Sequence, residues 1–452
     1  MANLSDIKYY PDRFYIRLEG CDIPNLFVPK DDFKLTLDQA AFMHEYYHYL
    51  TNITTFQGVR SFHAAFCDLF RLVTIITHKK GLDAFPVEQN QFAECEYEVG
   101  YWKELNEIFT EDNINMTLNK ETKNSPSKSF HITKIGRELG KEFVVKKDGQ
   151  EIKGRREFVR IDIEGLQSID HFRLSLGALD EFLSASVDQF LFEKDLANYT
   201  EIFKDRDFYP YSTFDEIQKY YGLRLGSREM IVVTYYVLHS PNPAVQLIEI
   251  LERLQQDGPE ELEKAPEEYM NKHFSIFTEY NNLINELDNF VEEARSSKRH
   301  LAAHLLSYYQ DRFITANVLA KKDPLFFIRP FLIDNLEDIW QRQEFWIGFN
   351  RIRTCFPEPL MIQGKEFVTT RPCEYGADLT VLALAIYEII ESLEKNKVAK
   401  RLDHYKNRYN YLGDDDNCDD VASFGEPPLC AYWHRALNEL GLYEFYRKNV
   451  RI

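Results

Sequence analysis

The sequence predicts an α+β fold in which helices dominate. Three observations support this class: short strand-like runs near the N-terminus, a β-rich segment at 129–163, and a long helical pattern over 214–320. The chain has 452 residues, of which 14% are aromatic, so it is long enough for two or three domains with large cores. We therefore expect a core with a β-rich insertion, followed by a large helical C-terminal half.

The first elements are two predicted strands and two predicted helices. Residues 13–20 and 25–29 have the pattern of short strands, because apolar and β-branched residues alternate between turn residues. A helix is predicted to begin after Thr36, which has a glutamine three residues later and so fits a capping box. A second helix is predicted over 58–80.

The later elements are one β-rich region and further helices. Asp148-Gly149 is a strong hairpin signal inside the β-rich segment 129–163. A helix is predicted from about Phe172 to Phe192, and another over 378–395.

Charge and composition exclude several classes of protein. The formal net charge is -19, which opposes binding to nucleic acid or to an anionic membrane. The basic stretches 146–156 and 395–408 are interpreted as solvated faces. No signal peptide and no spanning segment is recognisable, and the seven scattered cysteines are typical of reduced thiols. We expect a cytoplasmic protein without a nucleic-acid or membrane partner.

The stretch His44-Glu45-Tyr46-Tyr47-His48 matches HExxH. Residues four apart lie on the same face of a helix, so both imidazoles can reach one metal ion. Glu45 is turned by about 100° from His44, which places it beside the metal as a general base. The two histidines also continue the apolar stripe of their helix, where unpaired imidazoles would be costly. Two hydrogen-bonded core histidines are the alternative interpretation.

A third ligand is expected on another helix. In the helix centred on Glu181, the same face carries mostly small or apolar residues: Leu174, Gly177, Ala178, Ser184, Ala185, Asp188 and Phe192. An acid on such a face is costly unless it is paired or bound to a metal, and the small residues permit close approach. Glu181 is the preferred ligand and Asp180 is the rival, with Ser184 as a possible support for the ligand.

These two helices resemble the zincin metallopeptidases, specifically the gluzincin pattern of HExxH followed by a downstream Glu. The resemblance implies a Zn²⁺ ion held by His44, His48 and Glu181, with Glu45 as general base in the hydrolysis of a peptide bond. It also implies an oxyanion-stabilising residue, for which His171, Tyr235 and Tyr236 are candidates by residue type only.

The predicted domain organisation follows from the resemblance. Residues 1–200 are expected to form the zincin-like core with the β-rich segment inside it. Residues 201–320 are expected to form a helical domain and 321–452 an accessory region. The β-rich segment is a candidate for aligning an extended peptide by strand addition, and 200–452 for docking a regulatory protein partner.

Two further groups could bind metal but are better explained without it. His300 and His304 have helical ligand spacing but no adjacent glutamate, so a surface or core pair is favoured. The residues Cys418, Cys430 and His434, with Cys355 or Cys373, do not have the spacing of a common zinc knuckle.

We hypothesise a zinc-dependent metalloendopeptidase that acts on a protein or peptide substrate, in a bacterial stress, toxin or defence setting. Two alternatives stay open. Two histidines and a carboxylate also form the ligand set of non-haem iron oxygenases. The third possibility is a non-catalytic binding or regulatory module with a structural metal.

Overall fold

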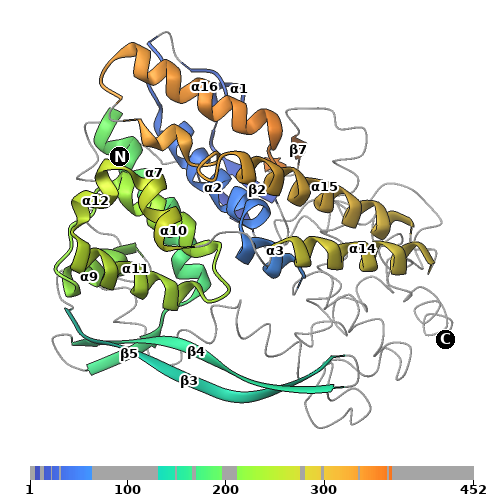
Figure 1. Cartoon of the computed structure of the whole chain (residues 1–452). Coiled ribbons are helices and arrows are strands. Elements are labelled where there is room, and N and C mark those ends of the chain that lie inside the picture. Colours follow the sequence, from blue (N-terminus) through green and yellow to red (C-terminus); the bar gives the residue numbers. More distant parts are fainter. Residues whose placement is uncertain are drawn as a thin grey trace, which may run out of the picture.

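The computed structural model describes residues 6–10, 15–21, 23–29, 32–63, 131–147, 150–164, 169–195, 211–274, 280–296, 300–333, 336–363 and 366–368. Most of these residues are helical, and two small sheets accompany the helices. Figure 1 shows the helices α2 and α7 near the centre, with the sheet β3-β4-β5 to one side. The mixed, mainly helical class predicted from the sequence is confirmed at this level.

The N-terminal sheet joins the two ends of the described chain. Its strands are β1 (Asp6–Tyr10), β2 (Tyr15–Glu19), β6 (Leu360–Gln363) and β7 (Glu366–Val368), in the order β1-β2-β6-β7. β2 pairs antiparallel with β1 and parallel with β6. The strand predicted at 13–20 is confirmed as β2, and β1 forms the edge of the sheet next to α2.

The strand predicted at 25–29 is wrong, because the chain forms the one-turn helix α1 (Ile23–Leu26) there. Proline is favoured in the first turn of a helix, and Pro24 occupies that turn. The turn buries Leu26, which is 1% exposed. Gln39 of the next helix donates from Nε2 to the carbonyls of Asn25 and Val28, at 2.8 and 3.0 Å. Tertiary contacts therefore stabilise a helical turn over a strand-like local pattern.

The helix α2 (Leu37–Thr54) begins as the sequence predicts. The Thr36 side chain accepts from the Gln39 N–H, and the Gln39 side chain accepts from the Thr36 N–H, so the capping box is complete. The helix ends at Thr55, which caps α3 (Phe56–Phe62) by accepting from the Gly58 N–H. The helix predicted over 58–80 overlaps α3, and its residues after 63 lie outside the described part of the chain.

The second sheet confirms the β-rich segment. β3 (His131–Lys147), β4 (Gln150–Glu164) and β5 (Ile169–Arg173) form an antiparallel sheet in the order β3-β4-β5. Asp148-Gly149 lies outside the described residues, but Lys147 pairs with Gln150 on either side of it.

The helix predicted from Phe172 begins later, at Leu176. Phe172 belongs to β5, where it pairs with Ile161 and is fully buried. The apolar pattern fits a strand and a helix equally at this point, and the sheet contact decides between them. Ser175 then starts α7 (Leu176–Asp195), because its hydroxyl accepts from the Ala178 N–H at 2.9 Å.

The helices α9 to α15 confirm the helical pattern predicted over 214–320, and two further helices follow it. They are α9 (Thr213–Tyr220), α10 (Ser227–Leu238), α11 (Pro243–Asp257), α12 (Pro259–Lys264), α13 (Pro266–His273), α14 (Tyr280–Ser296), α15 (His300–Lys322), the 3-10 helix η7 (Arg329–Leu332) and α16 (Ile339–Cys355). The helix predicted over 378–395 lies outside the described residues.

The helix α2 is packed on several sides. Tyr46 donates its hydroxyl proton to the carbonyl of Phe356, and Tyr47 donates to the carbonyl of Phe327 at 2.8 Å. Both rings are buried, Tyr46 against Phe349 and Tyr47 against Phe331. These contacts fix the rotation of α2 about its axis and so determine which side chains face α7.

The predicted domain boundaries at residues 200 and 320 stay a prediction, although elements on either side of each boundary contact one another. α10 packs against α7 across the bound at 200, and β6 pairs with β2 across the bound at 320. In the part of the chain that the structure describes, no helix is long and apolar enough to cross a membrane.

The crossing of α2 and α3 depends on Gly58. A Cβ atom at this position would collide with the carbonyl oxygen of Thr51 and the Cα of Asn52. We expect Gly58→Ala to lower the free energy of unfolding by roughly 1–3 kcal/mol, because the backbones of the two helices must move apart. Urea unfolding followed by circular dichroism measures this change. Gly136→Ala is the control, because its Cβ would meet only Lys134 Cε at 3.9 Å. Equal stability of the two variants would contradict the predicted helix contact.

Candidate metal centre

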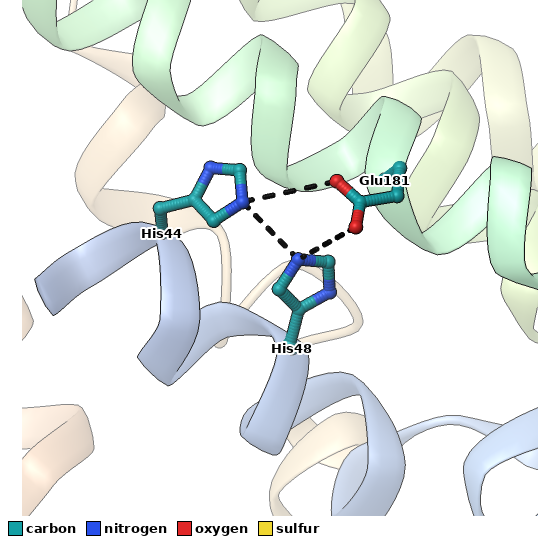
Figure 2. A group of neighbouring side chains, drawn as sticks. All are labelled: His44, His48 and Glu181. Atoms are coloured by element: carbon teal, nitrogen blue, oxygen red, sulfur yellow. Dashed lines mark hydrogen bonds and ion pairs between the residues drawn. The ribbon is translucent and has the colours of Figure 1, made fainter. Parts of the chain in front are cut away.

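Three potential ligands meet where α2 faces α7. The Nε2 atoms of His44 and His48 are 3.2 Å apart. Glu181 of α7 lies opposite both, with Oε2 at 3.8 Å from His44 Nε2 and Oε1 at 3.7 Å from His48 Nε2 (Figure 2). Within the described residues, these three side chains form a group whose ligand atoms lie within 4.8 Å of one another and could hold a metal ion.

The spacing of these atoms fits a metal ion. Two nitrogens bound tetrahedrally at 2.0–2.1 Å from one ion would be about 3.3 Å apart. The observed Nε2 separation is 3.2 Å, and the Glu181 oxygens need to approach by only a few tenths of an ångström. Glu181 Oε2 is also buried without a hydrogen-bond partner. A buried carboxylate oxygen with no donor is costly, and a cation at this point would satisfy it.

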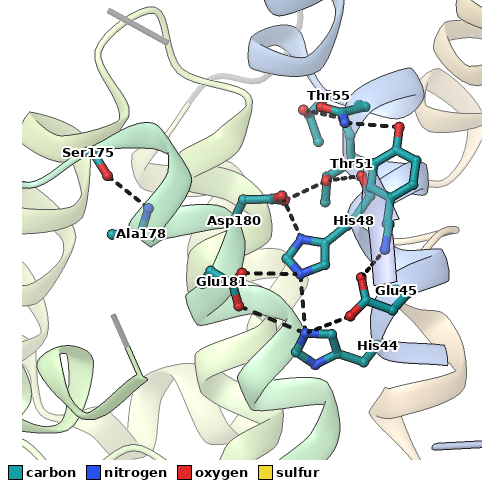
Figure 3. Close-up of polar contacts among 11 residues, drawn as sticks. His44, Glu45, His48, Thr51, Thr55, Ser175, Ala178, Asp180 and Glu181 are labelled. Carbon is teal, nitrogen blue, oxygen red and sulfur yellow. Dashed lines mark hydrogen bonds and ion pairs between the residues drawn. The ribbon is translucent and has the colours of Figure 1, made fainter. Parts of the chain in front are cut away.

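Each imidazole is held from behind by a carboxylate of α7, and Figure 3 shows this contact for His48 and Asp180. His48 Nδ1 lies 2.6 Å from Asp180 Oδ2, and His44 Nδ1 lies 2.9 Å from Asp188 Oδ2. An ionised carboxylate only accepts hydrogen bonds, so each Nδ1 carries a proton, and with a metal ion bound each ring would be neutral and present the lone pair of Nε2 to it. Two lone pairs and a carboxylate then face one point, which requires a positive charge between them.

The geometry favours Glu181 over Asp180 as the third ligand. Glu181 faces the two Nε2 atoms, whereas Asp180 contacts His48 Nδ1 on the far side of the ring. Thr51 donates its hydroxyl proton to Asp180 Oδ1 at 2.6 Å and so fixes that carboxylate. Asp180 is therefore a residue that orients a ligand, as is usual for carboxylates behind metal-binding histidines.

The small residues on α7 allow the close approach that the sequence suggests. Ala178 and Ser184 are buried on the face that carries Glu181. Ser184 was expected to support the ligand, but this expectation is wrong, because its buried hydroxyl has no hydrogen-bond partner. Asp188 and Asp180 provide the support instead, because only a longer side chain reaches the back of each imidazole.

Glu45 lies beside the metal-binding atoms, as its helical position predicts. Its Oε2 accepts a hydrogen bond from the Tyr9 backbone N–H at 2.6 Å. Its Oε1 lies 4.0 Å from His44 Nε2. One oxygen is thus fixed by the edge strand β1 while the other faces the centre, so Glu45 can serve as a base without being a ligand.

The electrostatics of the group reflect burial among four carboxylates. Burial lowers the pKa of His48, but Asp180 and Glu181 outweigh this effect and raise it to about 10. The pKa of His44 is also raised, because Asp188 outweighs burial. Burial raises the pKa of Glu45, although His44 and His48 oppose that shift. The centre therefore attracts cations strongly, either protons or a metal ion.

Two contributors to the centre were missed from the sequence. β1 was not predicted, although Ile7 and Tyr9 are buried and Lys8 is exposed, which is the alternation of a strand. Asp188 was recognised on the ligand face without a role. Its role depends on the exact separation of the two helices, which periodicity does not supply.

The three candidates for an oxyanion-stabilising residue are not members of this ligand group. Tyr236 donates its hydroxyl proton to Asn271 Oδ1 at 3.2 Å, the ring of Tyr235 meets His239 edge-on, and His171 lies on β5. An oxyanion role for any of the three stays a prediction.

The two weaker metal hypotheses receive no support. His304 is exposed on α15, as expected of a surface histidine. Cys355 is an exposed free cysteine on α16, and the residues Cys373, Cys418, Cys430 and His434 lie outside the described part of the chain.

Comparison with known proteins adds no relative. No family model, no curated protein and no solved structure matches the chain. The resemblance to zincins therefore stays a prediction based on two helices, and the centre is interpreted from its own geometry.

The ligand assignment predicts the effect of removing each imidazole. We expect His44→Ala and His48→Ala to lose bound metal, because two remaining ligands do not hold an ion against water. Metal content per chain, measured by mass spectrometry after equilibration with Zn²⁺, tests this. His304→Ala is the matched control and should keep the wild-type metal content. Wild-type metal content in either ligand variant would exclude the assignment.

The orienting role predicts a smaller effect for the carboxylates on α7. We expect Asp180→Asn and Asp188→Asn to weaken metal binding about 10–100-fold while the fold is retained, because the imidazoles lose their fixed tautomer. Competition with a zinc-binding dye measures the affinity. Affinities equal to the wild type would show that the two carboxylates do not orient the histidines.

Proposed function

We propose that this protein is a zinc-dependent hydrolase that cleaves peptide bonds in a protein or peptide substrate. The observation that carries the proposal is the arrangement of four side chains. His44, His48 and Glu181 converge on one point, and Glu45 has one oxygen directed toward that point while the other is fixed. Three protein ligands with an adjacent base are the arrangement of catalytic zinc sites, whereas structural sites usually have four protein ligands.

Each residue of the centre has a separate role in the proposed hydrolysis. Zn²⁺ bound at this point would polarise a carbonyl group and lower the pKa of water. Glu45 Oε1 accepts the proton of the attacking water and later delivers it to the leaving amine. The raised pKa of Glu45 suits both steps, because a base poised nearer neutrality can accept and release the proton. Asp180 and Asp188 keep the imidazoles in position throughout.

The edge strand β1 is placed where it can pair with an extended peptide substrate. The Tyr9 N–H points away from β2, because it donates to Glu45 instead of the neighbouring strand. The outer edge of β1 therefore faces the centre, and an extended peptide can pair with such an edge. The β-rich segment 129–163 was expected to supply this edge, but it forms a separate sheet. Alignment of the substrate is better assigned to β1.

The charge of the centre favours hydrolysis over oxygenation. Four carboxylates surround two imidazoles, so the centre keeps a surplus of negative charge with one divalent ion bound. A 2-oxoacid cosubstrate would bring a further carboxylate to the metal, which this surplus opposes. An uncharged peptide carbonyl meets no such repulsion.

Replacement of the base tests the proposal directly. We expect Glu45→Gln to reduce peptide hydrolysis by at least about 10²-fold, because general acid–base catalysis contributes 10²–10⁴-fold. Cleavage of a fluorogenic peptide library by the zinc-loaded chain measures the rate. Metal content equal to the wild type would show that chemistry, not zinc, was lost.

The control is Glu344→Gln, which changes an exposed acid on α16 and should leave the rate unchanged. Full activity in Glu45→Gln would exclude Glu45 as the base. Iron in the purified wild type together with turnover of a 2-oxoacid would favour the oxygenase instead. Zinc retention without any cleavage would favour a binding module with a structural metal.

A further inference from the structure

Arg312 on α15 is a buried cation that has no carboxylate partner among the residues that the structure describes. The residue is 9% exposed, and its guanidinium donates from Nη2 to the hydroxyl of Tyr308. Its Nε is enclosed and has no hydrogen-bond partner. Among the residues that the structure describes, no Asp or Glu contacts Arg312.

A second buried arginine, Arg353, allows a comparison of the partners that each guanidinium has. Arg353 is 8% exposed, and its guanidinium bonds Glu358 and also Asn350. Both guanidinium groups lie over an aromatic ring, Arg353 over Phe27 at 4.0 Å and Arg312 over Tyr308 at 4.2 Å. The two guanidinium groups therefore differ in their acidic partner. Arg353 has Glu358, and Arg312 has no such partner among the described residues.

An unpaired buried guanidinium is a costly feature. Arginine does not lose its proton at any ordinary pH, so it remains charged after leaving water. The ring and the hydroxyl of Tyr308 offset only part of the lost hydration. The chain has 73 Asp and Glu residues, so acids are not scarce. The position is explained if an anion from outside the chain completes it.

The surroundings of Arg312 extend to the metal centre. Several tyrosines lie near it, and we name Tyr9, Tyr49, Tyr308 and Tyr309 the tyrosine cluster. Tyr49, Tyr308 and Tyr309 interact electrostatically with the guanidinium. The ring of Tyr49 meets that of Tyr9 at 6.1 Å, and the Tyr9 N–H holds Glu45. The cluster thus separates Arg312 from the base by a few side chains.

We propose that Arg312 binds a carboxylate anion within the tyrosine cluster. A planar carboxylate matches the guanidinium fork, and the Tyr308 hydroxyl, which accepts from Arg312, can donate its own proton to the same anion. One guanidinium neutralises one negative charge, so a monoanion fits better than a dianionic phosphate. The carboxylate is either a free small molecule or an acidic group of the substrate that reaches the metal centre.

The first test measures the stability of the folded chain without an added carboxylate. Arg312→Met removes a charge without leaving an acid unpaired, so the zinc-loaded variant should unfold in urea at a midpoint equal to or above that of the wild type. Arg353→Met removes the cation beside the buried carboxylate of Glu358, so its midpoint should fall. A fall in Arg312→Met as large as that in Arg353→Met would show a structural role and overturn the proposal.

The second test measures the binding of a small carboxylate through the thermal midpoint of unfolding. Sodium propionate should raise the thermal midpoint of the zinc-loaded wild type by several degrees in a saturable manner, because binding only to the folded chain stabilises it. Propionamide and sodium chloride at equal concentration are the uncharged and ionic controls. The response should vanish in Arg312→Met and persist in Arg329→Met, which changes an exposed arginine. An equal response in wild type and Arg312→Met, or a larger response to phosphate, would refute a carboxylate site.

The third test identifies the source of the carboxylate. Zinc-loaded Glu45→Gln is titrated with fluorescent peptides that end in a free carboxylate or in an amide. About tenfold tighter binding of the free acid, abolished by adding Arg312→Met, would assign the carboxylate to the substrate. Equal binding of both peptides, with the propionate response intact, would assign it to a free molecule. The propionate measurement does not depend on hydrolysis, so failure of the proposed activity leaves this site testable.

Discussion

The structure depends on the electrostatic contact between α2 and α7. Two Nε2 lone pairs lie 3.2 Å apart opposite the carboxylate of Glu181, in a region largely withdrawn from water. Such groups repel one another unless a positive charge lies between them. The carboxylates behind each imidazole keep the lone pairs pointed inward and so exclude the rotations that would relieve the repulsion. A bound metal ion would turn this strained contact into the strongest link between the two helices.

The rest of the molecule holds that contact in place. Tyr46 and Tyr47 of α2 donate to the carbonyl groups of Phe356 and Phe327, which opposes a rotation of α2 that would turn its histidines away from α7. The N-terminal sheet gathers strands from both ends of the described chain and directs one backbone N–H at Glu45. Segments 345 residues apart in sequence, such as those of Tyr15 and Leu360, thereby help to position one carboxylate and two imidazoles. This arrangement is consistent with a site whose chemistry requires fixed geometry.

Positive and negative charges are distributed unequally around this site. The metal centre gathers four carboxylates on α2 and α7, whereas Arg312 lies buried beside the tyrosine cluster without one. Tyr9 and Tyr49 connect the candidate metal centre with the carboxylate site that we propose at Arg312. An occupant that carries a carboxylate at a distance from a scissile carbonyl would satisfy both ends. Electrostatic complementarity of this kind selects substrates more than it tightens their binding.

The sequence by itself determined the parts that depend on local spacing. The capping box at Thr36, the positions of His44, Glu45 and His48 on one helix, and the placement of Glu181 on a small-residue face all follow from helical periodicity. Only the tertiary structure decided which carboxylate faces the two Nε2 atoms, because Asp180 and Glu181 are adjacent in sequence and the rotation of α7 against α2 separates their contacts. The same holds for Asp188 and for the strand β1, since contacts between distant segments depend on packing that no local pattern encodes.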